Sequence, residues 1–149
     1  MAPIYLDTSA VNKLILAELE SDALAAFLAD WPERVASALV VVETGRAVMR
    51  ASTAGRQERA RLVLAGLNLL PMDAPVLERA AATLPANLRS LDAIHLASAL
   101  SLPGLAGMVV YDRRLAAAAL HLGLQVFSPG RPAAGRQPLL ALRLKHSEH

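Results

Sequence analysis

Short apolar runs alternate with helix-forming segments along most of the chain, and this alternation limits the possible folds more than any other feature. The first run, Ile-Tyr-Leu at residues 4–6, passes directly into a helical pattern, and Gly-Met-Val-Val-Tyr at 107–111 does the same. Strands that alternate with helices are typical of a parallel sheet with right-handed crossovers. We therefore predict an α/β fold with a central parallel β-sheet of about four or five strands, flanked by α-helices on both faces.

The apolar periodicity places these elements along the chain. Strands are predicted at residues 4–6, in the first half of 34–42, and at 67–72, 107–111 and 125–127. Helices are predicted at residues 9–17, 20–31, 57–65, 74–84, 91–102 and 113–122, with a further helix that contains Glu43, Arg46 and Arg50. A side-chain oxygen can accept from the unpaired N–H groups of a first helical turn, so we expect caps at Thr8 or Ser9, at Asp73 and at Ser90.

The length of 149 residues predicts one domain. We place this domain at residues 1–129 and regard 130–149, a basic segment that contains Pro and Gly, as a C-terminal extension. The chain contains no cysteine, which excludes disulfides, zinc–thiolate sites and cysteine nucleophiles. Because the first predicted strand begins within a few residues of Met1, we expect no secretory signal and a cytoplasmic protein.

The apolar content of 54% raises the question of a membrane span. The longest segment without Asp, Glu, Lys or Arg is residues 93–111, which is long enough to cross a bilayer. Pro103, Gly104 and Gly107 divide this segment into a buried helix, a turn and a strand. We therefore expect no membrane-spanning segment. The formal net charge of +2 is compatible with a nucleic-acid partner without requiring one.

Four acidic residues occupy comparable places in the predicted fold. Asp7 and Asp112 follow strands, whereas Glu43 and Asp92 lie early in helices that follow loops. In a doubly wound sheet such places converge at the carboxyl edge, where ligands bind. Two carboxylates about 4 Å apart repel by on the order of 4 kcal/mol at an effective dielectric constant of about 20, so such a cluster needs a cation. Mg²⁺ and Mn²⁺ prefer oxygen ligands and can activate water for a displacement at phosphorus.

Each acidic residue also has a purely structural interpretation. Asp7 can be a turn or cap residue, and Asp92 and Asp112 can complement helix dipoles, an interaction worth roughly 0.3 to 1 kcal/mol. Glu43 directly follows three valines, which favours a role in a site over a purely solvated one. His95 lies one turn after Asp92, and we expect it to pack behind the site rather than to bind a ligand.

Several basic residues near the predicted acidic edge are candidate contacts for phosphate oxygens, which guanidinium groups bind in pairs. They are Lys13, Arg46, Arg50, Arg113 and Arg114. The alternative for Arg46 and Arg50 is a solvated helix face or pairing with Glu43, and Lys13 has the same alternative. His121 is expected only to end its helix.

Four motifs carry a resemblance to a known family. They are LDTSAV around Asp7, VVVETGRAVMR around Glu43, RSLDAIHLASAL around Asp92 and VVYDRRLAAAA around Asp112. In this order they resemble the PIN-domain ribonucleases, specifically the VapC-type toxins of type II toxin–antitoxin systems, and the likeness covers residues 3–129. The resemblance implies a PIN-like nuclease domain that depends on Mg²⁺ or Mn²⁺, forms a homodimer, and is inhibited by a small VapB-like antitoxin whose C-terminal segment occupies the active-site groove.

The same resemblance assigns roles to individual residues. Asp7, Glu43, Asp92 and Asp112 become metal-binding and catalytic residues, and Thr8 or Ser9 becomes a supporting hydroxyl. Our own hypothesis takes Asp7 and Asp92 as the central ligands. The chain departs from the family pattern at Val110, because many relatives have Ser or Thr directly before the Tyr-Asp pair. A hydroxyl that could help to hold a metal-bound water is therefore absent. The segment after Pro129 also extends beyond the usual end of such domains.

The predicted activity is hydrolysis of RNA phosphodiester bonds by a metal-activated water. Aromatic residues make up 3% of the chain, which argues against a broad base-stacking surface and favours recognition of RNA shape and a few exposed bases. A transfer RNA or a ribosomal RNA loop is the expected substrate. One alternative is a non-catalytic binding module on a degenerate scaffold. Another is a phosphotransferase with Asp7 as nucleophile, although that chemistry usually has a second Asp where this chain has Ser9.

Overall fold

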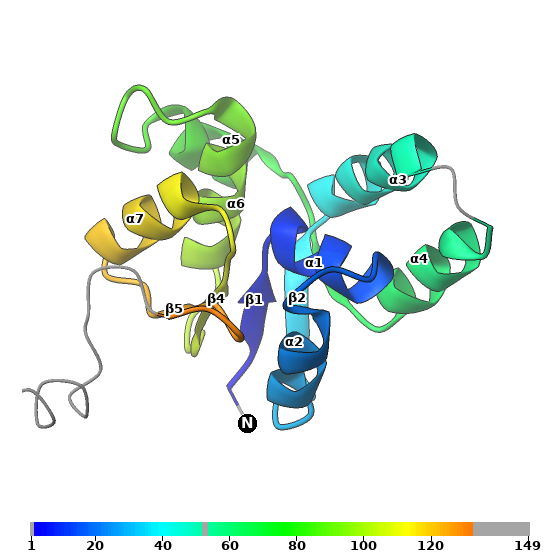
Figure 1. The fold of residues 1–149 in the computed structure, drawn as a ribbon. Helices are drawn as coiled ribbons and strands as arrows, with labels where there is room; N and C mark the ends of the chain where they lie inside the picture. Colours follow the sequence, from blue (N-terminus) through cyan, green and yellow to red (C-terminus); the bar gives the residue numbers. More distant parts are fainter. Residues whose placement is uncertain (1, 52–53, 133–149) are drawn as a thin grey trace, which may run out of the picture.

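The protein is built on a five-stranded parallel sheet (Figure 1). This computed structural model describes residues 2–51 and 54–132. The strands are β1 (Ile4–Leu6), β2 (Arg34–Ser37), β3 (Asn68–Leu70), β4 (Gly107–Val109) and β5 (Val126–Phe127), in the order β3-β2-β1-β4-β5. Every pairing between neighbouring strands is parallel, which confirms the predicted sheet.

Helices cover both faces of this sheet. They are α1 (Thr8–Ile15), α2 (Ser21–Leu28), α3 (Leu39–Ala51), α4 (Arg56–Ala65), α5 (Ala74–Ala81), α6 (Ser90–Leu100) and α7 (Arg113–His121). Successive strand residues point to opposite faces. Ile4 and Leu6 pack with buried residues of α1, α2 and α4, whereas Tyr5 packs with residues of α6 and α7. Figure 1 shows α1 to α4 on one side of the sheet and α5 to α7 on the other, as predicted.

The strand order reverses between β1, the middle strand of the sheet, and its neighbour β4. From β1 the chain continues through β2 to β3 on one side, and then returns to form β4 and β5 on the other. Leu6 pairs with Val109, and the N–H of Asp7 donates to the carbonyl of Val109 over 3.3 Å. Asp7 and Asp112, which follow these two strands, therefore lie at the edge where α/β sheets bind ligands.

The element boundaries agree broadly with the sequence prediction, but two predicted caps are wrong. Asp7, rather than Thr8 or Ser9, caps α1, because its carboxylate accepts from a first-turn N–H over 3.0 Å. A carboxylate already at the cap position leaves both hydroxyls free for other partners. At α6, Ser90 is the first helical residue, and Arg89 occupies the cap position without a side-chain cap hydrogen bond.

The helices of the described ranges are short. Asp73 caps α5 as predicted, since its Oδ1 accepts from the N–H of Val76 over 3.1 Å. That helix ends at Ala81 rather than at residue 84, because the next N–H groups bond to carbonyls three residues back and tighten the last turn. No helix in these ranges is long and apolar enough to cross a membrane.

The segment after β5 packs against the loop that follows β4. The hydroxyl of Tyr111 donates to the carbonyl of Pro129 over 2.7 Å, and Arg131 donates to the carbonyl of Tyr111 over 2.9 Å. Residues 128–132 are thereby tied to the body of the domain. The rest of the predicted extension, 133–149, lies outside the described residues.

Candidate active site

Asp7 is a buried carboxylate at the end of β1, with 3% of its surface exposed. Its Oδ1 accepts from the Ser9 hydroxyl over 2.6 Å and from the Ala10 N–H over 3.0 Å. Burial raises the pKa of Asp7 to about 6, because the loss of water outweighs these hydrogen bonds and the nearby His95. Within residues 2–51 and 54–132, no Lys or Arg forms an ion pair with Asp7.

Glu43 is held by a chain of hydrogen bonds that starts in the core. Its Oε1 accepts from the Thr8 hydroxyl over 2.5 Å and lies 2.8 Å from Nε2 of His95. The Nδ1 atom of His95 lies 2.7 Å from the hydroxyl of Tyr5, which accepts from the Ser37 N–H over 3.1 Å. If the Tyr5 hydroxyl donates to Nδ1, then Nε2–H of His95 points to Glu43 and also to the oxygen of Thr8, which lies 3.0 Å from Nε2.

These contacts determine the charge of Glu43. Burial opposes its ionisation, but the hydrogen bonds from His95 and Thr8 outweigh burial and hold the pKa of Glu43 below its ordinary value. Burial raises the pKa of the Tyr5 hydroxyl far above its usual range, so this group stays protonated and can donate. His95 therefore lies behind Glu43 and orients it, in the place that the sequence predicted.

Arg89 joins the other two acidic residues. Its Nε donates to Oδ2 of Asp92 and its Nη2 donates to Oδ2 of Asp112, both over 3.1 Å. Asp112 also caps α7, because its Oδ1 accepts from the Leu115 N–H over 3.0 Å. The negative charges, Asp92 first, raise the pKa of the guanidinium. The Arg89 side chain is 64% exposed, so solvent weakens this bridge and the side chain can leave it.

The four acids thus line one edge of the sheet but stand in separate groups. Glu43 ends the hydrogen-bonded chain from the core, and Asp92 and Asp112 share one guanidinium. Asp7 accepts hydrogen bonds but has no cationic partner in the described ranges. The α6 helix connects the groups, since it carries both Asp92 and His95. Among the residues that the structure describes, no three His, Asp or Glu side chains are close enough to hold one metal ion as placed. The predicted four-acid pocket is therefore not assembled in this arrangement.

Both predicted supporting hydroxyls contact an acidic residue. Thr8 donates to Glu43, and Ser9 donates to Asp7 while its oxygen accepts from the Tyr111 N–H over 2.9 Å. Ser9 therefore links the ends of β1 and β4. Val110, where relatives often carry a hydroxyl, is completely buried and packs on the side of the sheet that α6 and α7 cover.

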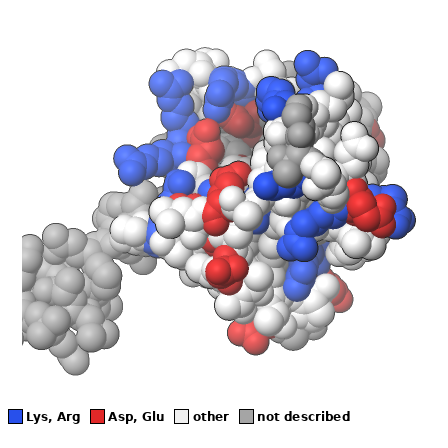
Figure 2. Space-filling model, turned by 45° about the vertical axis from the view of Figure 1, so that its right-hand side comes forward, with Lys and Arg blue, Asp and Glu red and all other residues white. Residues whose placement is uncertain are grey.

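The basic residues that were predicted to contact phosphate differ in their availability. Those with exposed side chains are Arg46, Arg50, Arg113 and Arg114. Lys13 is 7% exposed, and its Nζ lies 2.8 Å from carboxylate oxygens of both Glu18 and Glu20. Lys13 is thus paired within the protein and largely buried, unlike the four exposed arginines. On the face of the molecule drawn in Figure 2, acidic side chains lie among Lys and Arg side chains.

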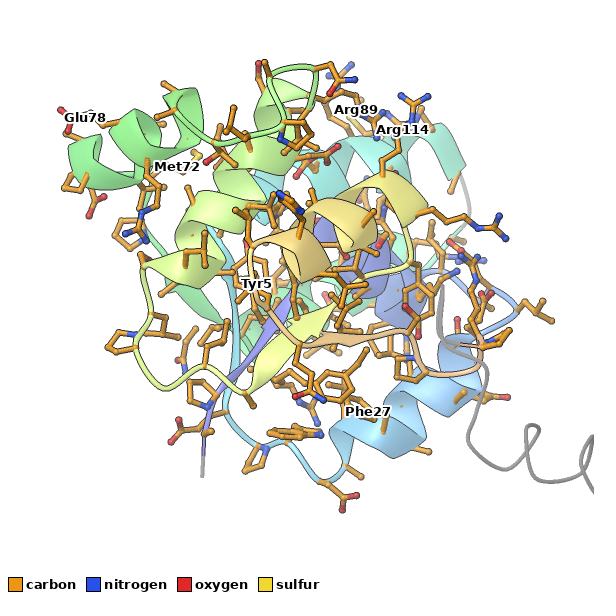
Figure 3. All side chains as sticks on the ribbon, turned by 90° about the vertical axis from the view of Figure 1, so that its left-hand side faces the viewer. Tyr5, Phe27, Met72, Glu78, Arg89 and Arg114 are labelled. Atoms are coloured by element: carbon orange, nitrogen blue, oxygen red, sulfur yellow. The ribbon has the colours of Figure 1, made fainter. Side chains whose placement is uncertain are left out.

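Sequence reasoning missed two residues of this arrangement, Tyr5 and Arg89. Arg89 stands three positions before Asp92, a spacing that allows an ion pair. Tyr5 stands in an apolar strand, where a buried hydroxyl needs a partner, but the spacing gives no indication of which partner. In Figure 3, Tyr5 lies in the interior, whereas Arg89 and Arg114 extend from the same end of the molecule.

The donor set fits a hard divalent cation. Buried charges in proteins are normally paired or bound to metal, and Asp7 has no such partner in the described ranges. In the same ranges, Oδ2 of Asp7, Oε2 of Glu43 and Oδ1 of Asp92 have no hydrogen bond. Carboxylate oxygens of this kind suit Mg²⁺ and Mn²⁺. Asp112 differs, because both of its oxygens are already engaged.

Comparisons with known proteins agree with this arrangement. A model of the PIN domain family matches residues 4–120. Ribonuclease VapC46 of Mycobacterium tuberculosis H37Rv is 45% identical over 130 residues, which cover 87% of this chain and 99% of the relative. Ribonuclease VapC35 of the same organism is 47% identical over 133 residues, which cover 86% of this chain and 98% of the relative.

Solved structures share the fold at lower identity. A toxin–antitoxin complex from Klebsiella pneumoniae aligns with a TM-score of 0.67 and 21% identity, covering 87% of this chain and 99% of that chain. The M. tuberculosis toxin VapC20, described as cleaving the sarcin–ricin loop, aligns with a TM-score of 0.63 and 20% identity. That alignment covers 77% of this chain and 94% of VapC20.

Proposed function

The chain belongs to the PIN-domain family as a VapC-type toxin, and on that premise we propose that it cuts structured RNA with Mg²⁺ or Mn²⁺ and is neutralised by a small VapB-like antitoxin. The family match and the relatives named ribonucleases, 45% and 47% identical over most of the chain, make it an endoribonuclease toxin. The ion, the RNA target and the antitoxin are the parts that we propose. An RNA substrate also favours the cytoplasm as its location.

The observation that carries the metal proposal is the state of Asp7. This carboxylate is buried at the point where the strand order reverses, and it has hydrogen-bond donors but no ion-pair partner in the described ranges. Burial raises its pKa to about 6, so keeping it ionised there costs free energy. A cation at this edge would offset that free energy. Such an ion, when bound, would supply Lewis acidity and activate water for attack on phosphorus.

The chain's own residues position and polarise this site. Ser9 fixes Oδ1 of Asp7, and Oδ2 would bind the ion. Thr8 and His95 fix Oε1 of Glu43 and hold the group ionised, so its second oxygen can accept a proton or a hydrogen bond from water. We assign Asp7 and Asp92 as central ligands, with Glu43 and Asp112 completing the acidic edge.

The substrate that we propose is an RNA loop, from a transfer RNA or a ribosomal RNA. Exposed arginines beside the acidic edge can contact phosphates on both sides of the cut: Arg46, Arg50, Arg113 and Arg114. Phosphates are the same in every RNA sequence, so guanidinium groups that bind phosphates position the RNA without selecting its bases. VapC20, which shares the fold, is described as cleaving the sarcin–ricin loop.

A homodimer and an antitoxin are the protein partners that we propose. The toxin–antitoxin complex from K. pneumoniae, which has the same fold, supports an antitoxin. Exposed apolar side chains on α3, among them Val41 and Val42, provide surface that a second protein could cover. Gel filtration with light scattering would test the dimer, and a monomer at micromolar concentration would contradict it.

The two alternative functions are a non-catalytic binding module and a phosphotransferase, and they differ from our proposal in what each would bind or require. A non-catalytic binding module would have no need of a divalent ion, and the Arg89 bridge between Asp92 and Asp112 is the observation that favours it. A phosphotransferase with Asp7 as nucleophile has no support from the family match. A calorimetric titration with Mn²⁺ separates the first rival from our proposal, because the binding module should show no binding.

The experiment that tests the proposal is cleavage of total bacterial RNA by the purified protein with Mg²⁺, with Mn²⁺ and with EDTA. Asp92→Asn is the test variant, and Asp73→Asn is a matched control, because Asp73 caps α5 and its carboxylate accepts from the N–H of Val76. New RNA ends are mapped by sequencing. We expect metal-dependent cuts at a few loops that Asp92→Asn loses and Asp73→Asn keeps. Cuts that survive in EDTA or in Asp92→Asn would refute the proposed site.

A further inference from the structure

A hollow of about 870 Å³ lies between α7 and the loop that leads into α6, next to the acidic edge. The helix contributes Arg114, Ala117 and His121 to its wall, and the loop contributes Leu84, Asn87 and Arg89. Leu84 is 64% exposed, so an apolar side chain faces solvent at this place. None of the described residues that line the hollow is acidic.

The sequence of α7 explains why this hollow exists. Arg114, Ala117 and His121 are spaced at i, i+3 and i+7, so they share one face of the helix. The opposite face is anchored in the core through Leu115, Ala116 and Ala119. Because Ala117 carries only a methyl group, the exposed face has a gap between an arginine and a histidine.

The hollow adjoins the acidic edge directly. Arg89 lines the hollow and at the same time donates to Asp92 and Asp112. Arg114 lies two positions after Asp112 and lines the hollow from the other side. Figure 3 shows Arg89 and Arg114 at one end of the molecule. A polymer bound at Asp92 and Asp112 would therefore continue into the hollow.

We propose that this hollow is a subsite for one unstacked nucleotide of the RNA, next to the phosphate that is cut. This inference rests on the proposed function. Leu84 and Ala117 offer apolar surface to the face of a base, and the amide of Asn87 carries both donors and acceptors for a base edge. The guanidinium groups of Arg89 and Arg114 can stack on a base or bind its phosphate.

The chemistry of the walls favours a nucleotide over a purely apolar ligand. The hollow combines two guanidinium groups and an imidazole with apolar walls, which matches a molecule that carries a flat apolar part and a negative charge. The chain has few aromatic residues on which several bases could stack. A single pocket of this kind would let the protein select one base of a loop while the other contacts remain unselective.

The test fills the hollow with Ala117→Trp and uses Leu120→Trp as the matched control. Ala117 is exposed, so the new ring enters the hollow without displacing the core. Leu120 lies on the same helix, is 49% exposed and does not line the hollow. Circular dichroism and calorimetric Mn²⁺ binding confirm that both variants keep the fold and the acidic edge. Affinity is then measured in EDTA by fluorescence anisotropy on hairpin RNAs with randomised loops, and cut sites are sequenced with Mg²⁺.

We expect Ala117→Trp to bind the hairpins roughly tenfold more weakly or worse, since one stacked base contributes on that scale. It should also lose the preference for one base beside the cut, whereas Leu120→Trp matches the wild type. Equal affinity and equal cut sites in the two variants would overturn the subsite and leave the nuclease function intact. A variant that cuts RNA normally but no longer binds the antitoxin would overturn it as well and assign the hollow to a protein partner. If the wild type itself cuts nothing, the proposed function fails and the subsite fails with it.

Discussion

Replacing Asp7 with Asn should make the metal-free protein more stable at neutral pH, although we expect catalysis to depend on this residue. Burial raises the pKa of Asp7 from 3.8 to about 6, and the hydrogen bonds from Ser9 and Ala10 offset only part of that rise. The ionised carboxylate is therefore unfavourable in the folded state. Asn carries no charge, and its side-chain oxygen can still accept from the N–H of Ala10 and cap α1.

The sign and the size follow from proton linkage. The folded state holds the Asp7 proton more tightly than the unfolded chain does. The contribution of protonated Asp7 to the unfolding free energy is therefore fully present below the unfolded pKa of 3.8, and it is lost as the pH rises through about 6. A rise of this size corresponds to about 3 kcal/mol of unfolding free energy. We take that figure as an upper limit for the gain in Asp7→Asn at about pH 8.

The assay is urea denaturation in EDTA at about pH 4 and at about pH 8. Asp73→Asn serves as the control, because Asp73 is an exposed cap on α5 and should change little at either pH. We expect Asp7→Asn to be more stable than wild type at the higher pH, with a difference that shrinks towards zero at the lower pH. Added Mn²⁺ should stabilise the wild type more than Asp7→Asn. An Asp7→Asn protein that is no more stable than wild type at about pH 8 would show that the buried carboxylate does not destabilise the folded state.

Three further substitutions test separate parts of the structure. Tyr5→Phe leaves a backbone N–H and the Nδ1 of His95 without their partner, so it should lower the unfolding free energy by about 1–3 kcal/mol in urea; an unchanged midpoint would contradict this. Gly107→Ala places a methyl group 2.7 Å from atoms of Gln125 and Phe127, and overpacking of this kind typically costs about 1–3 kcal/mol; a wild-type melting temperature would argue against such a close approach of β4 and β5. Arg89→Ala removes the cation between two carboxylates and should tighten Mn²⁺ binding severalfold in calorimetry. The control Arg113→Ala removes the same charge outside that bridge and should change Mn²⁺ binding less. Weaker Mn²⁺ binding in Arg89→Ala would count against competition between arginine and metal.

The sheet and the places of the acids could be predicted because they depend on local pattern. The apolar runs identified every strand of the described sheet, and a residue that follows a strand of a parallel sheet must lie at its carboxyl edge. This is why Asp7 and Asp112 were expected near each other. The cap of α1 was harder to predict, because Asp7 and Thr8 are both good cap residues. In the structure Asp7 caps the helix, and the Thr8 hydroxyl donates to Glu43, a tertiary contact that the local sequence does not reveal.

The partners of the acids could not be predicted from spacing. Tyr5 and His95 are 90 residues apart, and Arg89 and Asp112 are 23 apart, so these contacts exist only after the sheet has formed. The convergence of four carboxylates on one ion was predicted from the carboxyl edge of the sheet, from charge repulsion and from the family resemblance. An arginine of the same chain balances Asp92 and Asp112 instead, and none of those three grounds indicates it.

The most direct test of the account is the position of Mn²⁺ in a crystal of the protein, located by anomalous diffraction. We predict a peak in contact with the carboxylate of Asp7 and with at least one of Asp92 and Asp112, with Arg89 displaced from its bridge. A peak elsewhere on the surface, or an Arg89 bridge that persists at saturating Mn²⁺ with Asp7 unbound, would contradict the claim that these acids form a metal-dependent nuclease site.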